Sequence, residues 1–251
     1  DNYITDSAGG GTAMATGHKT NNRYIGVDAT GVKQPAIPDL IQRYGMESAL
    51  ISAGDITDAT PAAFYGHQSD RAMEDDIAKD FLSSPVNIMI GGGLQHFEHR
   101  KDGLSLTTPL QQKGYTISRH FSELDNMRSR KWLMLDSVAE APVLKGRGDF
   151  LSRSLKKAIN TLQDNRNGFF IMAEGAQIDI GGHANNLPYN VTEMMDFDKA
   201  IGAAMEFADS NGETLVIVTA DHETGGLSLL DGNFQKGYVN GHFSTNDHTS
   251  V

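Results

Sequence analysis

The chain has 251 residues, a formal net charge of −11 at pH 7 and no cysteine. Its length suffices for one sizeable core, and a hydrophobic fraction of 39% is ordinary for a globular protein rather than a disordered or fibrous one. The acidic balance argues against a nucleic-acid backbone as partner, and the lack of cysteine excludes disulfides and thiolate metal sites.

Short apolar runs alternate with stretches of helical period, which is typical of an α/β domain with a largely parallel sheet. The expected strands are Ser48–Ser52, Val86–Ile90, Lys131–Leu135, Gly168–Ala173 and Leu215–Ala220. The last two are rich in Ile, Val and Phe with little alternation, so we expect them to be buried on both faces.

Two helices are predicted from apolar residues at helical spacing. The first covers Leu151–Leu162, and the second runs from a capping box of Asn190 and Glu193 to Gly212. Both apolar stripes are interpreted as core packing. The stripe of the second helix consists of Val191, Met194, Met195, Ile201, Met205 and Ala208.

The N-terminal residues lack the pattern of a signal peptide, and no stretch approaches the ~18 consecutive apolar residues of a membrane-spanning helix. Both ends of the chain resemble interruptions within secondary structure. We therefore expect a single domain, residues 1–251, that is truncated at both ends.

Ser7 stands at the start of a glycine-rich stretch, Ala8–Ala13. At a helix start, free backbone N–H groups and the positive helix end would stabilise an alkoxide or an attached phosphate at this hydroxyl. Two interpretations remain open from these residues alone: a nucleophile, or a glycine-rich turn in which Ser7 is the helix N-cap. A metal ion is one way to ionise a serine near neutral pH.

Possible metal ligands follow the strand predicted at Gly168–Ala173. Glu174 lies at the strand end, and Asp179 and His183 are four residues apart, so one helical turn would bring carboxylate and imidazole to the same side. A single pair at this spacing is weak evidence and also fits a solvated helix face.

An adjacent Asp221 and His222 follow the last predicted strand, at the edge of an open parallel sheet where ligands bind. The alternative is a solvated loop. His248 is equally compatible with a metal ligand and with a surface histidine.

Arg71 follows the segment Asp58–Ala63 and is able to hold phosphate oxygens with both arms of its guanidinium. Considered alone, Arg71 is more simply explained by pairing with Glu74 or Asp75.

Taken together, these segments resemble the alkaline phosphatase family, in the family's order and over nearly the whole chain. The matching segments are Thr5–Ala8 with Thr12–Ala13 and Thr16–Gly17, Asp58–Ala63 through Arg71, Glu174–Asp179 with His183, Thr219–His222, and His248–Thr249. The resemblance implies an α/β sandwich, with helices on both faces of a mostly parallel central sheet and with N- and C-terminal strands missing.

The resemblance also implies the hydrolysis of phosphate monoesters through a phosphoserine intermediate on Ser7. Arg71 would bind the phosphate, oriented by Asp6, with Asp58 in the same substrate-binding group. The implied cofactors are two zinc ions and one magnesium ion. The first zinc would bind Asp179, His183 and His248, the second Asp221 and His222, and magnesium Thr60 and Glu174.

The chain departs from the family pattern in that no upstream strand supplies the aspartate that bridges the second zinc and the magnesium. Ile180 also stands where relatives often carry a polar or aromatic residue. The simplest hypothesis is an internal fragment of a longer protein, whose exposed strand edges would favour aggregation.

Two alternatives remain beside the phosphomonoesterase. One is a non-catalytic zinc-binding fragment, and the other is a phosphodiesterase or sulfatase of the same superfamily, against which Arg71 and the residues around Ser7 argue. The expected partners are small phosphomonoesters. The resemblance further implies a periplasmic or extracellular location and often a homodimer.

Overall fold

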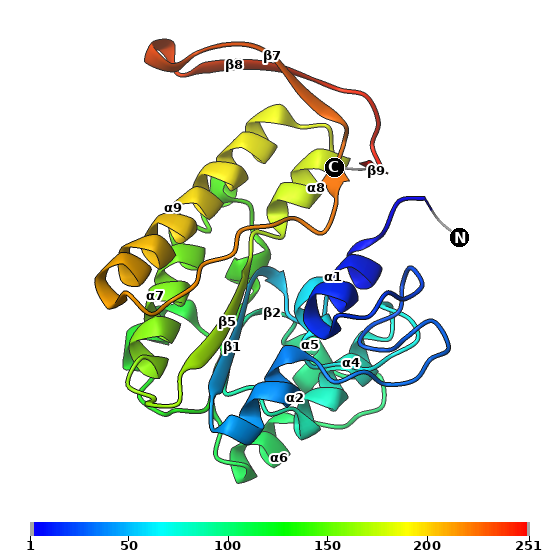
Figure 1. Cartoon of the computed structure of the whole chain (residues 1–251), viewed down its shortest axis with the longest axis vertical. Coiled ribbons are helices and arrows are strands. Elements are labelled where there is room, and N and C mark those ends of the chain that lie inside the picture. The colour runs from blue at the N-terminus through cyan, green and yellow to red at the C-terminus, as the bar shows by residue number, and fades with distance from the viewer. Residues whose placement is uncertain (1–2, 250–251) are drawn as a thin grey trace.

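The structure is a computed structural model that describes residues 3–249 (Figure 1). The α-helices are α1 (Ser7–Thr16), α2 (Ile37–Ile41), α3 (Ala59–Ala63), α4 (Glu74–Asp80), α5 (Gln95–Glu98), α6 (Thr107–Gln112), α7 (Phe150–Leu162), α8 (Gln177–His183) and α9 (Leu187–Asn211). Short 3-10 helices lie at η1 (Gln42–Tyr44), η2 (Phe81–Ser83), η3 (Phe121–Asn126), η4 (Ser137–Glu140), η5 (Val143–Lys145) and η6 (Phe234–Lys236).

The central sheet is parallel throughout and has the strand order β3-β4-β2-β1-β5. Its strands are β1 (Glu47–Asp55), β2 (Ile88–Gly92), β3 (Thr116–Ser118), β4 (Trp132–Leu135) and β5 (Phe169–Glu174). Two antiparallel pairs complete the β-structure: β6 (Glu223–Thr224) with β9 (His248–Thr249), and β7 (Leu227–Asn233) with β8 (Tyr238–Phe243). The α/β fold and four of the five expected strands are confirmed, with strand ends that agree within three residues.

Helices cover both faces of the sheet (Figure 1). Successive residues of β1 alternate between two cores: Leu50 packs with α3 and α4 on one face, whereas Ala49 and Ile51 pack with α7 and α9 on the other. This alternation follows from the two-residue period of a strand. A sheet that is buried on both faces explains why the middle of β1 shows no alternation of apolar and polar residues.

The strand predicted at Leu215–Ala220 is wrong. The segment is extended but forms no ladder among residues 3–249, and it leads from the end of α9 to β6 (Figure 1). Leu215 is 82% exposed and Ile217 is 75% exposed, although both read as core residues. An apolar run encodes a buried strand only where a neighbouring strand is present to pair with it.

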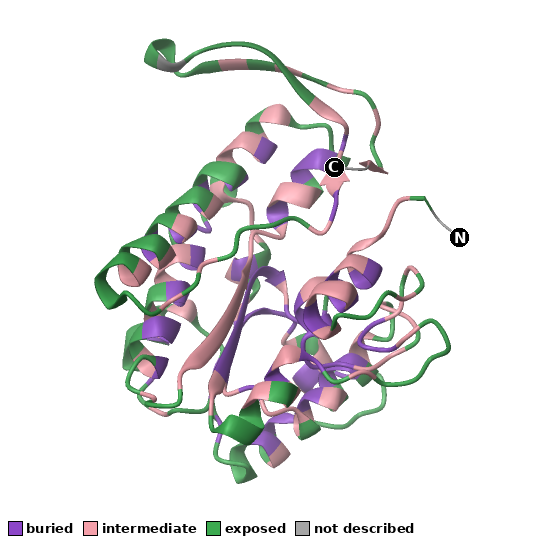
Figure 2. Cartoon of the chain, viewed as in Figure 1, coloured by how far each residue is buried: buried purple, intermediate pink, exposed green. Residues whose placement is uncertain are grey.

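The strand β5 was also expected to be buried on both faces, and this expectation is wrong. It is the edge strand of the sheet, and all six of its residues are partly exposed, while β1 is almost fully buried (Figure 2). In the described part of the chain, β5 pairs with a strand on one side only, that of β1, and the segment that follows α9 pairs with no strand.

The helix α9 begins earlier than predicted and buries a different face. Asn186 is its N-cap and accepts a hydrogen bond from the Tyr189 N–H, so the capping box at Asn190 and Glu193 is wrong. Met195 is 59% exposed, and the buried positions along the helix include Glu193 and Asp196. The three methionines of the predicted stripe, Met194, Met195 and Met205, therefore face outward, while Val191, Ile201 and Ala208 are half-buried. The inner face carries Glu193 and Asp196, which pair with Arg147, as well as Ala200 and Ala203.

In the portion of the chain that the structure describes, no helix is both long enough and apolar enough to cross a bilayer.

Candidate active site

The N-terminus of α1 places Ser7 at the carboxyl edge of the sheet. Asp6 is the N-cap, and its Oδ1 accepts a hydrogen bond of 2.9 Å from the Gly9 N–H. The interpretation of Ser7 as the N-cap is therefore wrong, because Ser7 is the first helical residue. Its Oγ is free for another partner and lies 2.9 Å from Nε2 of His222.

The glycines of α1 allow this helix to approach the segment that carries His222. A Cβ added at Gly10 would meet the Asp221 side chain at 3.0 Å and the Asp221 carbonyl oxygen at 3.2 Å. The absence of a side chain at Gly10 therefore lets Ser7 and His222 come within hydrogen-bond distance.

Three histidines from distant parts of the chain gather beside Ser7. The rings of His222 and His248 stack with their centroids 3.5 Å apart, and Nε2 of His183 lies 3.1 Å from Nε2 of His248. The short ladder between β6 and β9 produces this arrangement, because it pairs Thr224 with His248.

Asp179 supplies the carboxylate of this histidine cluster. Its Oδ2 lies 3.4 Å from Nε2 of His183 on the same face of α8, as the four-residue spacing predicted. Its Oδ1 lies 3.7 Å from Nε2 of His248 and accepts a hydrogen bond from the Thr224 hydroxyl. Metal-binding atoms of Asp179, His222 and His248 all lie within 4.8 Å of one another.

The hydrogen bonds of the Nδ1 atoms of His183 and His248 indicate that this cluster is suited to bind a cation. Nδ1 of His183 lies 2.8 Å from the Asn246 carbonyl oxygen, and Nδ1 of His248 lies 3.3 Å from the Thr5 carbonyl oxygen. A carbonyl oxygen only accepts, so both Nδ1 atoms carry the proton and both Nε2 atoms present lone pairs. Two lone pairs that face each other beside a carboxylate form the donor set of a zinc site.

A second polar group surrounds Glu174 at the end of β5. The Ser52 hydroxyl, which pairs with Glu174 in the register of β1 and β5, donates a hydrogen bond of 2.6 Å to Oε2. Burial raises the pKa of the Glu174 carboxyl to about 7, against the hydrogen bonds from Ser52 and Thr60, and the charges of Asp58 and Asp221 raise it further. Carboxylates that raise one another's pKa indicate a place where a cation would be stabilised.

Ser52 and Thr224 belong to this site, but the sequence alone did not identify them. Ser52 is fully buried, and a hydroxyl three residues before the carboxyl end of a buried strand is the signal that could have found it. Thr224 follows His222 by two residues and had no distinguishing signal.

Arg71 faces the same edge of the sheet. Its NH2 lies 2.6 Å from Oδ1 of Asp58, and its NH1 lies 3.6 Å from Oδ2 of Asp6. The simpler pairing with Glu74 or Asp75 is wrong, because those two carboxylates contact the His96 ring instead. Arg71 therefore lies beside the N-cap of α1, Asp6, which directly precedes Ser7.

All the predicted site residues fall into two linked groups. The group around the histidines consists of Ser7, Asp179, His183, Asp221, His222 and His248. The group around Glu174 and Arg71 consists of Asp6, Asp58, Thr60, Arg71 and Glu174. Asp6 and Ser7 are adjacent and join the two.

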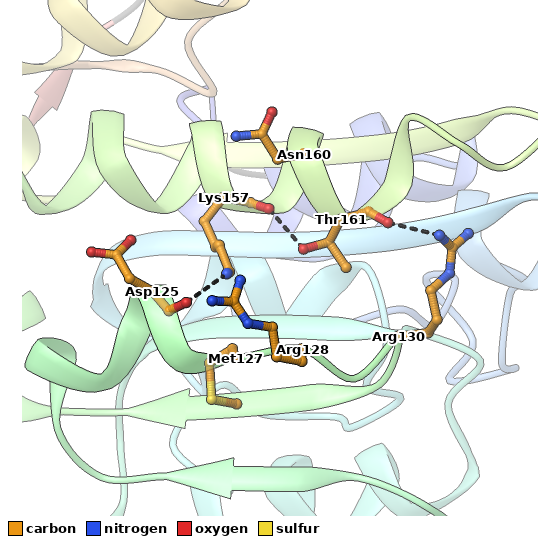
Figure 3. Close-up of a pocket in the computed structure, with 7 residues that line it drawn as sticks. All are labelled: Asp125, Met127, Arg128, Arg130, Lys157, Asn160 and Thr161. Carbon is orange, nitrogen blue, oxygen red and sulfur yellow. Dashed lines mark hydrogen bonds between the residues drawn. The ribbon is translucent and has the colours of Figure 1, made fainter.

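A hollow with basic side chains lies at the opposite edge of the sheet, close to where β1 and β4 begin (Figure 3). Two of its three cations have partners: Arg130 pairs with Glu47, and Lys157 donates to the Asp125 carbonyl oxygen. None of the predicted site residues lines it. The predicted site residues therefore lie at the carboxyl edge of the sheet and not in this hollow.

Comparison with known proteins agrees with the geometry. A family model described as alkaline phosphatase matches residues 1–247. Alkaline phosphatase 4 of Bacillus subtilis is 37% identical over 238 residues, which cover 91% of this chain and 51% of that protein. The chain thus spans about half the length of this relative.

Solved structures show the same likeness. The alkaline phosphatase of the Antarctic bacterium TAB5 is 40% identical and superimposes with a TM-score of 0.91, over 99% of this chain and 75% of that one. A variant of the TAB5 enzyme with Mg bound in the M3 site is 39% identical, also with a TM-score of 0.91, over 99% of this chain and 75% of that one.

Proposed function

The chain belongs to the alkaline phosphatase family, and we propose that its site hydrolyses phosphate monoesters to an alcohol and inorganic phosphate. One observation carries this proposal: Ser7 Oγ lies 2.9 Å from Nε2 of His222, at the N-terminus of a helix. A serine in this position has the positive helix end, a histidine cluster and the nearby Arg71 around it, which together suit nucleophilic attack on a phosphate.

We propose that the two linked groups hold two zinc ions and one magnesium ion. The zinc ligands would be Asp179, His183 and His248 in one site and Asp221 and His222 in the other, with Thr60 and Glu174 as magnesium ligands. Imidazole and carboxylate donors suit zinc, and hydroxyl and carboxylate oxygens suit magnesium. When bound, these ions supply positive charge that lowers the pKa of a hydroxyl and stabilises charge on phosphate oxygens.

The chain's own residues would carry two displacements. In the first, Ser7 Oγ loses its proton and attacks phosphorus, the ester P–O bond breaks, and the alcohol leaves with a proton from water. In the second, water attacks the phosphoserine, the bond from phosphorus to Oγ breaks, and inorganic phosphate leaves as the serine hydroxyl is restored. Arg71 would hold two phosphate oxygens through both steps, with Asp6 and Asp58 orienting its guanidinium.

The direct test is hydrolysis of a chromogenic aryl phosphate with zinc and magnesium present. Turnover is expected, and it should disappear in Ser7→Ala and in the presence of a chelator. Soluble, folded, zinc-loaded protein without turnover would contradict the enzymatic function. A tight zinc site in such a protein would support the alternative of a non-catalytic zinc-binding domain.

We further propose that residues 1–251 form one catalytic core, that the whole protein is exported, and that it is a homodimer. These proposals rest on the family resemblance. Size-exclusion chromatography with light scattering tests the dimer, and fractionation of the source cells tests the location.

A further inference from the structure

Arg23 has a backbone conformation that is uncommon for a residue with a side chain. Its φ is +73°, and Asn185 is the other non-glycine residue with a positive φ among residues 3–249. The left-handed conformation costs about 1–2 kcal/mol for a residue with a Cβ, so the surrounding contacts must hold it in place.

The backbone of Arg23 contacts two residues of the candidate active site. Its N–H donates to both carboxylate oxygens of Asp6, at 3.1 Å and 3.0 Å. Its carbonyl oxygen accepts a hydrogen bond of 2.8 Å from the Arg71 N–H. One residue therefore fixes both the backbone of Arg71 and the carboxylate that faces the Arg71 guanidinium.

The Arg23 side chain holds the residue that precedes Arg71. Nε lies 3.0 Å from Oδ2 of Asp70, and NH2 lies 2.7 Å from Oδ1, so the pair is bidentate. The two loops are also joined by a two-way bridge between Ile25 and Gln68, with both N–O distances 2.9 Å. The Arg23 side chain is 54% exposed, so the pair adds little to overall stability and acts mainly by restricting geometry.

We propose that Arg23 is a positioning residue for Arg71: it fixes Asp6, Asp70 and the Arg71 backbone so that the Arg71 guanidinium is preorganised for phosphate. The inference rests on the proposed function of Arg71 in binding phosphate. Preorganisation reduces the entropy lost when a side chain engages its ligand, so loosening Arg71 weakens phosphate binding.

The test compares three variants of the full chain. Arg23→Gly removes the side chain and suits the positive φ, Asp70→Asn removes the other half of the pair, and the double variant closes a thermodynamic cycle. The matched control is Arg153→Ala, which breaks the exposed pair of Arg153 with Asp125 (3.2 Å) near the opposite edge of the sheet.

In each single variant, KM and the inhibition constant of inorganic phosphate should rise together by about two- to fivefold, with kcat changed less, because an exposed pair is worth up to about 1 kcal/mol. The double variant should show no larger effect than either single variant. Arg153→Ala should leave both constants unchanged. A lower Tm with unchanged constants would show a merely structural role and overturn the proposal.

A second readout does not depend on turnover. The heteronuclear NOE of the Arg71 Nε–H group should fall in Arg23→Gly and stay unchanged in Arg153→Ala. An unchanged NOE in Arg23→Gly would overturn the positioning role. Absence of turnover in the unaltered chain would instead contradict the proposed function, so the two failures are distinguishable.

Discussion

Arg147 and Glu193 form an ion pair that joins the loop after η5 to the inner face of α9, with both side chains only 1% exposed. The same guanidinium lies 3.0 Å from Oδ2 of Asp196, which is equally buried. Two carboxylates therefore lie on the buried side of α9, the same side on which Ala200 packs in the core.

Arg147→Met should destabilise the protein by about 3–5 kcal/mol, because it leaves two buried carboxylates without their cation. The free energy of unfolding from urea titration measures this effect. Arg153→Met removes an exposed arginine from its carboxylate partners and should cost no more than about 1 kcal/mol. Equal effects of the two variants would show that the buried pair has no special role.

Zinc should raise the Tm of the chain, since a ligand that binds only the folded state stabilises it. His248→Ala and Asp179→Asn should abolish most of this rise, because their Nε2 and carboxylate atoms face the centre of the histidine cluster. His242→Ala, an exposed histidine on β8, should retain it. Calorimetry with and without zinc measures the shift, and an undiminished rise in His248→Ala would place the metal elsewhere.

Gly10→Ala should reduce phosphatase activity strongly, because the new Cβ would meet Asp221 at 3.0 Å and push α1 away from His222. Gly202→Ala is the matched control, since a Cβ at this position in α9 meets nothing within 4 Å. The control should raise stability by roughly 0.5–1 kcal/mol through helix propensity. Initial rates and Tm of the two variants provide the comparison. Unchanged activity in Gly10→Ala would show that the close approach is unnecessary.

The exposed segment after α9 should promote aggregation of the 251-residue chain. Ile217→Thr is expected to lower light scattering on concentration and to change the free energy of unfolding by less than about 0.5 kcal/mol, because this side chain is 75% exposed. Ile51→Thr, at a fully buried position of β1, should cost about 2 kcal/mol or more. A similar loss of stability in both variants would mean that the segment is packed in solution.

Acid should weaken the pair of Arg23 and Asp70. The hydrogen bonds from Arg23, together with one from the Ala72 N–H, lower the pKa of Asp70 to about 2, so this stabilisation is present above about pH 4 and is lost as the pH falls through about 2. Asp70→Asn should therefore be slightly less stable than the unaltered chain at pH 6 and equally stable near pH 2. Tm values of both proteins across this pH range measure the difference in stability. A difference that does not change with pH would contradict the ionised pair of Arg23 and Asp70.

Local patterns along the chain predicted much of the fold. The runs that became β1, β2, β4 and β5 and the helical stretch of α7 are all apparent from the sequence, because strand and helix periods are properties of short segments. The spacing of Asp179 and His183 likewise predicted their shared face on α8, which one helical turn is enough to produce.

Long-range neighbours were decided only by the tertiary structure. Leu215–Val218 and Ile88–Ile90 are both apolar runs, yet one is exposed and the other buried, because burial depends on whether a strand lies alongside. The burial of Glu193 and Asp196 on the inner face of α9 depended on Arg147, which lies 46 residues before Glu193. No local pattern carries that information.

The same division holds for the candidate site. The sequence alone supplied the residue types and their order, and the family resemblance supplied their implied roles. The contacts of Ser7 with His222, of His183 with His248 and of Arg23 with Asp70 join segments 215, 65 and 47 residues apart. Such contacts exist only after the sheet has brought the ends of its strands to one edge, because packing rather than local preference determines which distant side chains meet.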